Sequence, residues 1–212
     1  MNKVYVLGMG PGSREYILPV TVRIIRSCDI LIGGQRNLQY FQNLGKETHC
    51  IKADLRGIME YVQEKRKYKK IAFLLSGDTG FYSMLEYIKK YISIKDLEII
   101  PGISSFQYLM ARIGESWQDA FVGSLHGREW DFVEAVQSYG KAVFLTDHKY
   151  TPQQMAKKLV DHGMEDKIMI VGENLSYENE KIIRGTPKEI MDMPSFDMAV
   201  VVIKDEKDLL EL

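Results

Sequence analysis

The sequence predicts an α/β fold made of two α/β domains. Short apolar runs alternate with amphipathic stretches of helical period along the whole chain, which is typical of strands joined by helices. The length of 212 residues is near the upper end for one domain and is sufficient for two small ones. The alternation pauses at residues 114–119, as expected of an inter-domain linker. We therefore expect an N-terminal domain over residues 1–114 and a C-terminal domain over residues 119–212.

The first half has the pattern of a largely parallel sheet with helical crossovers. Its expected strands cover residues 4–7, 30–32, 49–51, 71–75 and 97–100. Residues 71–75 are apolar at every position, as a strand buried on both faces should be. Residues 55–62 and 106–113 carry apolar side chains at i, i+3, i+4 and i+7, and this spacing predicts amphipathic helices.

The second half predicts a mixed sheet with shorter helices and some antiparallel pairing. Its expected strands cover residues 121–124, 143–145, 168–171, 182–184 and 198–203. Thr151 and Thr186 are each followed by a proline, and Gln154 or Glu189 stands three positions after the threonine. This pattern predicts two capped helix starts, and Gly163 marks the end of the first of these helices.

Composition excludes several classes of protein. Lys and Arg number 28 against 29 Asp and Glu, so a net charge of −1 offers no broad attraction for nucleic acid or an anionic membrane. No apolar run approaches the roughly 20 residues of a membrane span, and the N-terminus begins as a strand. Cys28 and Cys50 are too few for a disulfide framework and form no metal-binding pair. We expect a cytoplasmic protein without protein-bound metal.

Three loops of glycine and small polar residues directly follow expected strands. They are Gly8-Met9-Gly10-Pro11-Gly12, Ser76-Gly77-Asp78-Thr79-Gly80-Phe81-Tyr82 and Pro101-Gly102-Ile103-Ser104-Ser105. The carboxyl ends of parallel strands share one edge of a sheet, and ligands bind there in open α/β folds. The first loop lacks the G-x-G-x-x-G spacing, and no acid follows the second strand, so a dehydrogenase is disfavoured. None of these loops is followed by the lysine and serine or threonine of a Walker A motif, so a nucleoside triphosphatase is also disfavoured.

Each loop, taken alone, also has a purely structural interpretation. The first is compatible with a tight turn between a strand and a helix. Asp78 and the pair Ser104 and Ser105 are compatible with helix capping. If Asp78 instead contacts a ligand from an exposed loop, Asp78→Ala should weaken binding and change the free energy of unfolding by less than about 0.5 kcal/mol.

Together, the three loops resemble the signature of the tetrapyrrole methylases, which are S-adenosylmethionine-dependent enzymes with two α/β domains. The resemblance extends from Val4 to about Ile203. In the second half, Ser124-Leu125-His126-Gly127-Arg128 and the segments 145–152 and 172–185 resemble the branch of the family that methylates carbon 5 of a corrin precursor.

The resemblance implies that S-adenosyl-L-methionine binds in a cleft between the domains. The cofactor-contact positions that it implies are Gly10, Pro11, Ser76, Gly77, Asp78, Phe81, Ser104, Ser105, Thr146 and Leu175. The implied substrate is a corrinoid tetrapyrrole with several carboxylates, which arginine forks suit. Arg36 and Arg128, expected in loops that face the cleft, are the candidate carboxylate ligands, and His126 is a candidate for substrate binding or proton transfer. Solvated arginines, and a histidine bonded to its own loop, are the alternatives.

The chain departs from the family pattern at two informative positions. Thr79 stands where the family usually has proline, which leaves Asp78 in place. Gly33 and Gly34 follow the second strand, where relatives acting on uroporphyrinogen carry an aspartate proposed as a base. No catalytic base is therefore carried over to this position, and the identity of the base stays open.

The resemblance also implies partners and alternatives. We expect a homodimer, and a separate C(15)-methyltransferase/decarboxylase that acts on the same corrinoid. Another tetrapyrrole methylase with a different target carbon, a diphthine-synthase-like enzyme with a protein acceptor, and a non-enzymatic nucleotide sensor remain the alternatives. Turnover of the cofactor with a corrinoid acceptor separates an enzyme from a sensor, and a protein acceptor would instead support the diphthine-synthase-like alternative.

Overall fold

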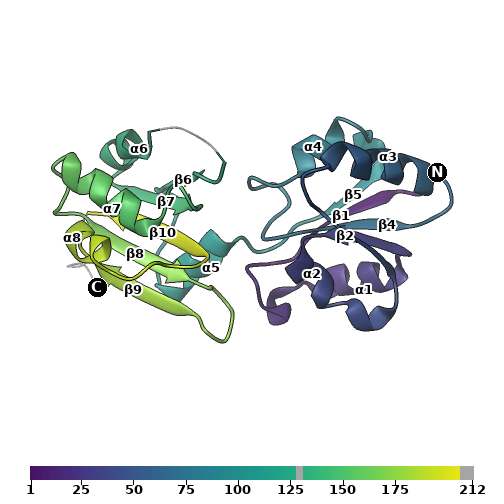
Figure 1. Cartoon of the computed structure of the whole chain (residues 1–212), viewed down its shortest axis with the longest axis horizontal. Coiled ribbons are helices and arrows are strands. Elements are labelled where there is room, and N and C mark those ends of the chain that lie inside the picture. Colours follow the sequence, from purple (N-terminus) through teal and green to yellow (C-terminus); the bar gives the residue numbers. More distant parts are fainter. Residues whose placement is uncertain (128–130, 206–212) are drawn as a thin grey trace. The chain divides into compact units, whose positions relative to one another are not determined.

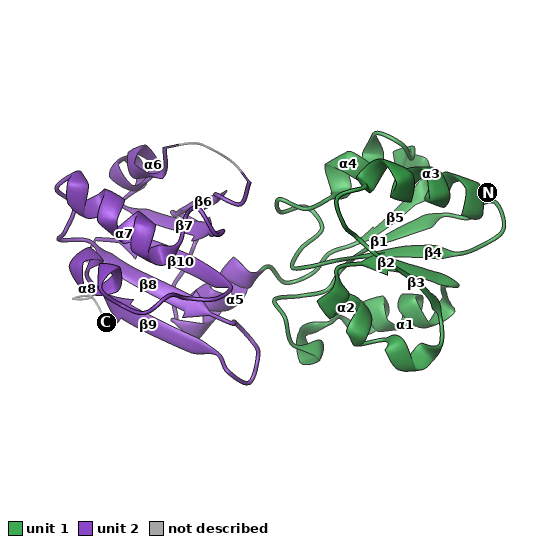
Figure 2. Cartoon of the chain, viewed as in Figure 1, with its two compact units in different colours: residues 1–104 green, residues 105–212 purple. Residues whose placement is uncertain are grey.

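The structure is a computed structural model that describes residues 1–127 and 131–205. The chain divides into two compact units, Met1–Ser104 and Ser105–Leu212, which Figure 2 shows in different colours. The division lies earlier in the chain than residues 114–119, where the sequence pattern pauses. The helix that follows Ser104 and the segment after it therefore belong to the second unit.

The first unit contains one 5-stranded sheet in the order β3-β2-β4-β1-β5 (Figure 1). Its strands are β1 (Val4–Gly8), β2 (Ile30–Gly33), β3 (Glu47–Cys50), β4 (Ile71–Leu75) and β5 (Leu97–Ile100). Every neighbouring pair is parallel, which confirms the predicted parallel sheet with helical crossovers. All four parallel pairings bring the carboxyl ends of the strands to one edge.

Helices cover both faces of this sheet (Figure 1). They are α1 (Pro19–Ser27), α2 (Gln35–Gln39), α3 (Leu55–Lys65) and α4 (Leu85–Lys89), with short 3-10 turns at Arg14–Tyr16, Gln42–Leu44 and Ile94–Asp96. Along β4, Ile71 and Phe73 belong to the core beside α3 and α4, and Ala72 and Leu74 belong to the core beside α1 and α2. The uniformly apolar sequence of β4 thus reflects burial on both faces.

The second unit contains another 5-stranded sheet, in the order β6-β7-β10-β8-β9. Its strands are β6 (Phe121–Ser124), β7 (Lys141–Leu145), β8 (Ile168–Glu173), β9 (Lys181–Gly185) and β10 (Ala199–Lys204). Only β6 and β7 pair in parallel, and the other neighbours are antiparallel. This arrangement confirms the predicted mixed sheet.

In the described part of the second unit, the helices that accompany the sheet are α5 (Ser105–Arg112), α6 (Phe132–Tyr139), α7 (Pro152–Asp161) and α8 (Pro187–Met191). Helices α6, α7 and α8 share one core with Phe144, Val171 and Val201 of the sheet. Both predicted caps are present, since Thr151 accepts a hydrogen bond from the backbone of Gln154 and Thr186 forms a full capping box with its glutamate.

Buried ion pairs hold residues 114–119 to the second sheet. Lys204, at the end of β10, is 1% exposed and forms an ion pair with Glu115. Lys141, at the start of β7, lies 3.4 Å from carboxylate oxygens of both Glu115 and Asp119. The segment that the sequence marked as a linker is therefore anchored to β7 and β10. Within residues 1–127 and 131–205, no helix is both long enough and apolar enough to cross a membrane.

Candidate active site

The loops after β1 and β4 are joined through their backbones. Gly10 donates its N–H to the carbonyl of Gly77 at 3.2 Å, and Gly77 donates back to Gly10 at 2.8 Å. Just before this bridge, the N–H of Met9 bonds to the carbonyl of Leu75 at 2.9 Å. Both glycines have positive φ angles, 79° and 68°, which L side chains rarely adopt. The two predicted loops therefore form one continuous backbone layer.

The loop after β5 is packed directly against this layer. A Cβ atom added to Gly102 would lie 2.3 Å from the carbonyl oxygen of Gly77 and 2.8 Å from the carbonyl carbon of Gly8. A Cβ on Gly8 would lie 2.4 Å from the backbone nitrogen of Gly102. These distances leave no space for a side chain, so glycine at positions 8 and 102 is what allows the three loops to meet.

Asp78 connects the loops that follow β4 and β5. Its Oδ1 accepts a hydrogen bond from the backbone of Gly80 at 2.7 Å, and its Oδ2 accepts one from Gly102 at 3.0 Å. The next helix, α4, begins only at Leu85, so the interpretation of Asp78 as a cap of that helix is wrong. Because both oxygens hold backbone groups, the small effect on folding expected for Asp78→Ala is revised below.

Helix α2 and the residue that directly follows it support the same layer with two side chains that sequence reasoning missed. Asn37, which is buried, donates from Nδ2 to the carbonyl of Leu74 and to the hydroxyl of Ser76, both at 3.2 Å. Tyr40 donates its hydroxyl to the carbonyl of Gly12 at 2.9 Å. Arg36 belongs to this helix and is exposed, so its expected place in a loop is wrong. A helix of only five residues, without a side-chain cap, left no recognisable pattern in the sequence.

The other residues of the first unit that were expected to contact the cofactor differ in their exposure to solvent. Ser76 is exposed, Pro11 and Phe81 are half-buried, and Ser104 is buried at the end of the third loop. Ser105 is the first residue of α5. Phe81 contacts Tyr82 edge to face, with ring centroids 4.8 Å apart.

In the second unit, Thr146 and Leu175 lie in loops after β7 and β8. Thr146 follows β7 and donates its hydroxyl to the carbonyl of Ala199 at 2.6 Å. Leu175 is 4% exposed and lies between Asn174 and Ser176, which have φ angles of 48° and 68°. Positive φ is uncommon in residues other than glycine, so this short loop has a constrained backbone.

The loop that contains His126 is held by two side chains through its backbone. His126 donates its backbone N–H to the hydroxyl of Ser124 at 3.3 Å, and Gly127 donates to Asp147 at 3.0 Å. Partial burial opposes ionisation of Asp147, but the N–H groups of Gly127, Tyr150 and Lys149 outweigh it and lower the pKa of Asp147. His126 itself is exposed. Arg128 lies outside the described residues.

The residues at the expected cofactor positions fit S-adenosylmethionine in their chemistry. They include one carboxylate, Asp78, and no basic side chain, which suits a ligand with a positively charged sulfonium. Serine and threonine hydroxyls suit polar groups of the ligand, and Phe81 and Leu175 supply apolar surface. Among the described residues, no group of three or more His, Cys, Asp or Glu side chains is arranged to hold a metal ion.

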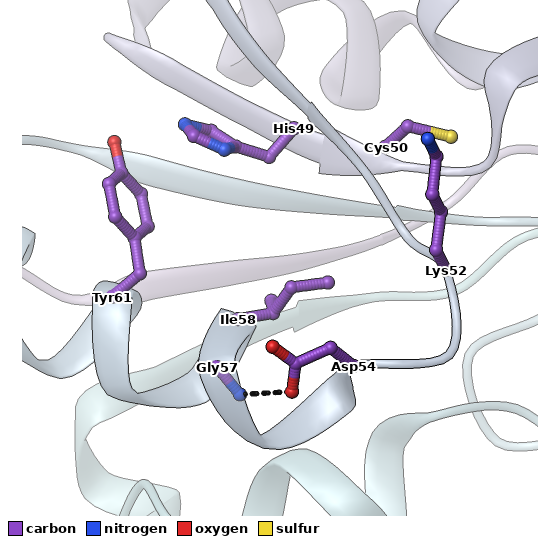
Figure 3. Close-up of a pocket in the computed structure, with 7 residues that line it drawn as sticks. All are labelled: His49, Cys50, Lys52, Asp54, Gly57, Ile58 and Tyr61. Atoms are coloured by element: carbon purple, nitrogen blue, oxygen red, sulfur yellow. Dashed lines mark hydrogen bonds between the residues drawn. The ribbon is translucent and has the colours of Figure 1, made fainter.

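A separate hollow of about 290 Å³ lies between β3 and the start of α3 (Figure 3). Three of its polar side chains, those of Asp54, His49 and Tyr61, already have hydrogen-bond partners. Asp54 accepts the N–H of Gly57 at 2.8 Å, and His49 and Tyr61 both bond to the carboxylate of Glu47. The hollow is lined from the edge strand β3, whereas the glycine loops follow β1, β4 and β5, so we do not assign it to the site.

Comparison with known proteins identifies the family. The family model described as Tetrapyrrole (Corrin/Porphyrin) Methylases matches residues 3–191. The chain therefore belongs to the tetrapyrrole methylases, and its fold class is that of this family.

Individual relatives indicate which branch of this family the chain resembles. The chain is 35% identical to a cobalt-precorrin-7 C(5)-methyltransferase of Salmonella typhimurium, over 95% of this chain and 98% of the relative. It is 32% identical to a protein of Methanocaldococcus jannaschii named as a probable cobalt-precorrin-7 C(5)-methyltransferase, over 97% of this chain and 100% of the relative. The chain is thus a methyltransferase of the tetrapyrrole family.

Solved structures show the same fold. The cobalt precorrin-4 methyltransferase CbiF matches with a TM-score of 0.81 at 19% identity, covering 95% of this chain and 94% of its own. The uroporphyrin-III C-methyl transferase of Thermus thermophilus, solved as a complex with S-adenosylhomocysteine, matches with a TM-score of 0.78 at 15% identity. That match covers 99% of this chain and 100% of its own.

Proposed function

We propose that this protein transfers a methyl group from S-adenosylmethionine to carbon 5 of cobalt-precorrin-7, a step in cobalamin biosynthesis. The observation that carries the proposal is 35% identity to an enzyme of that name over 98% of its length. The joined glycine loops of the first unit support it, because they form a built ligand surface at the carboxyl edge of a parallel sheet.

The cofactor contacts that we propose follow the family positions. In the first unit they are the loops around Gly10, Ser76 and Ser104. The Gly10–Gly77 bridge joins the first two loops, and Asp78 joins the second to Gly102 of the third. In the second unit they are Thr146 and Leu175. The hydroxyl of Thr146 donates its proton to Ala199, so toward the cofactor it would act as an acceptor, beside the backbone and methyl group of the same residue.

The sulfonium of the bound cofactor supplies an already activated methyl group. The contribution of this chain is therefore to orient the acceptor carbon in line with that group and to exclude water. Rigid loops suit this task, because small displacements of the reacting atoms cost much of the rate. We propose His126 for substrate binding or proton transfer, and Arg36 and Arg128 for the substrate carboxylates.

The decisive experiment is incubation of the purified protein with methyl-labelled S-adenosylmethionine and either cobalt-precorrin-7 or precorrin-7. Mass analysis should show one labelled methyl group on the corrinoid, and NMR should place it on carbon 5. Label on a different precorrin would favour another target carbon, and label on a protein acceptor would favour the diphthine-synthase alternative. Binding of S-adenosylhomocysteine without transfer to any acceptor would favour a sensor.

We further propose that the enzyme acts in the cytoplasm as a homodimer. We also propose that a separate C(15)-methyltransferase/decarboxylase acts on the same corrinoid. Analytical ultracentrifugation tests whether the protein is a homodimer, and reconstitution with a purified C(15) enzyme tests whether the two enzymes act on the same corrinoid.

A further inference from the structure

The loop between β8 and β9 has an unusual backbone. Asn174 and Ser176, on either side of Leu175, both have positive φ. In the described part of the chain, Tyr82 is the one other non-glycine residue with positive φ, and it lies in the loop of Asp78. Asparagine tolerates this conformation, but serine adopts it much less readily, so the surrounding structure must hold it.

The side chain of Leu175 is held inside the second unit. A Cβ atom on Gly172 would lie 2.7 Å from Leu175 Cδ2 and 2.8 Å from Leu109 Cδ1. The two leucines therefore converge over Gly172, and Leu109 belongs to α5. With its side chain packed inward, the loop exposes mainly its backbone to a ligand.

Glu180 holds the other side of this loop. Its Oε2 accepts the backbone N–H of Ser176 at 2.6 Å, and its Oε1 accepts from Arg112 Nε at 3.0 Å. Tyr108 also bonds to this carboxylate. Burial opposes the charge of Glu180, but the bonds from Ser176, Tyr108 and Arg112 outweigh it and lower the pKa of Glu180.

Glu180 thus connects the loop to α5, because Tyr108 and Arg112 both belong to that helix. Helix α5 starts at Ser105, and Ser105 and Leu175 are both cofactor positions in the proposed function. One partly buried carboxylate therefore ties together two segments that the proposed function assigns to the same ligand.

We propose that Glu180 is a positioning residue for cofactor binding, which holds the backbone of residues 174–176 in its binding conformation. The inference rests on the proposed function. Glu180 does not touch the cofactor in this proposal. It acts through the N–H of Ser176 and through α5, so its loss should relax the loop while the sheet and the core remain intact.

The test compares Glu180→Ala and Glu180→Gln with Glu178→Ala, which removes an exposed carboxylate from the same loop. Calorimetry measures the affinity for S-adenosylhomocysteine, thermal unfolding measures stability, and amide hydrogen exchange follows residues 174–177. We expect Glu180→Ala to weaken affinity roughly tenfold or more, because a hydrogen bond to a charged group is lost. Glu180→Gln should recover part of the affinity, since an amide oxygen still accepts from Ser176, and Glu178→Ala should match the wild type.

Faster exchange of residues 174–177 in Glu180→Ala, at an unfolding temperature near that of the wild type, supports the positioning role. Wild-type affinity in both Glu180 variants would overturn the inference and leave the proposed function intact. A loss of affinity that merely parallels unfolding, in Glu180→Gln as well, would also overturn it. If the wild type itself does not bind S-adenosylhomocysteine, the proposed function fails and the inference fails with it.

Discussion

The two units build their loops by different means. In the first unit, the glycine loops touch through backbone atoms: Gly10 pairs with Gly77, and Gly102 lies against Gly8. In the second unit, carboxylate side chains hold the loops through backbone N–H groups, with Asp147 bonded to Gly127, 20 residues away, and Glu180 bonded to Ser176, 4 residues away. A backbone layer needs small residues, whereas a layer held by carboxylates needs charge.

The difference predicts different vulnerabilities. The first unit should lose stability when a side chain is added at one of its contacting glycines. The second unit should lose stability when one of its carboxylates is removed. Both tryptophans, Trp117 and Trp130, lie in the sequence of the second unit. Tryptophan fluorescence therefore reports on that unit, and amide hydrogen exchange resolves both.

The largest effect is expected from Glu115→Ala. This change leaves Lys204, which is 1% exposed, without its carboxylate, and it also removes a partner of Lys141. Breaking a buried ion pair costs about 3–5 kcal/mol, and partial exposure of Glu115 favours the lower end. Urea unfolding followed by tryptophan fluorescence should show this loss in the second unit.

The matched control for that change is Asp166→Ala, which removes an exposed carboxylate from the same unit. It should shift the free energy of unfolding by less than about 0.5 kcal/mol. Equal unfolding midpoints for the two variants would mean that the buried lysines do not depend on Glu115.

The second effect is that of Gly102→Ala on the first unit. The added Cβ would lie 2.3 Å from the carbonyl oxygen of Gly77, and backbone cannot yield as a flexible side chain does. Overpacking of this kind costs about 1–3 kcal/mol, and we expect the upper end together with loss of S-adenosylhomocysteine binding. Calorimetry and hydrogen exchange of residues 76–82 measure both.

Gly34→Ala is the control, because a Cβ at Gly34 would meet no atom within 4 Å. It should leave both the free energy of unfolding and the cofactor affinity close to those of the wild type. If the two alanine variants behave alike, contact between the loops does not determine the site.

A smaller effect is expected from Asp78→Ala, which removes the acceptor of the N–H groups of Gly80 and Gly102. An unsatisfied, partly buried N–H costs about 1–3 kcal/mol, so we expect about 1–2 kcal/mol together with weaker cofactor binding. Asp78→Asn retains one acceptor oxygen and should recover part of both. Thermal unfolding measures the stability, and calorimetry measures the cofactor affinity. Unchanged stability would support the change of less than about 0.5 kcal/mol that was expected from the sequence.

The smallest expected effect is a gradual decrease in the free energy of unfolding as the pH is lowered. Burial opposes the charges of Glu115, Asp147 and Glu180, but lysines, backbone N–H groups and Arg112 outweigh it and lower the pKa of each carboxylate. A carboxylate with a lowered folded-state pKa stabilises the fold above its ordinary pKa, here 4.5 or 3.8, and this contribution disappears as the pH falls through the folded value. Fluorescence-monitored unfolding should lose stability over that window, and a flat profile would contradict the assigned role of these carboxylates.

Much of the fold was predictable because it depends on local patterns. Alternating apolar runs located every strand, and the prolines after Thr151 and Thr186 located the starts of α7 and α8. The glycine loops were also predictable, since their composition reflects the backbone contact that they make. The exceptions are Asp78, which does not cap α4, and Arg36, which lies in α2 and not in a loop.

The rest depends on residues that are far apart in sequence. Lys204 is paired with Glu115 from the opposite end of the unit, so nothing near Lys204 indicates its burial. Strand β7 begins at Lys141, ahead of the predicted start at residue 143, because that lysine is also neutralised from a distance. Asn37 bonds to the backbone of Leu74, 37 residues away, and Glu180 joins its own loop to Arg112, 68 residues away, so no spacing rule reveals such pairs.

The position of β10 has a consequence for synthesis on the ribosome. This strand is the last in the described chain, and it lies between β7 and β8, in the middle of its sheet. The first unit has all its strands once residue 100 has emerged, but β7 and β8 have no neighbour between them until residues 199–204 arrive. The nascent second unit therefore carries two unpaired strand edges until residues 199–204 have been synthesised, which leaves it more exposed to aggregation during synthesis than the first unit.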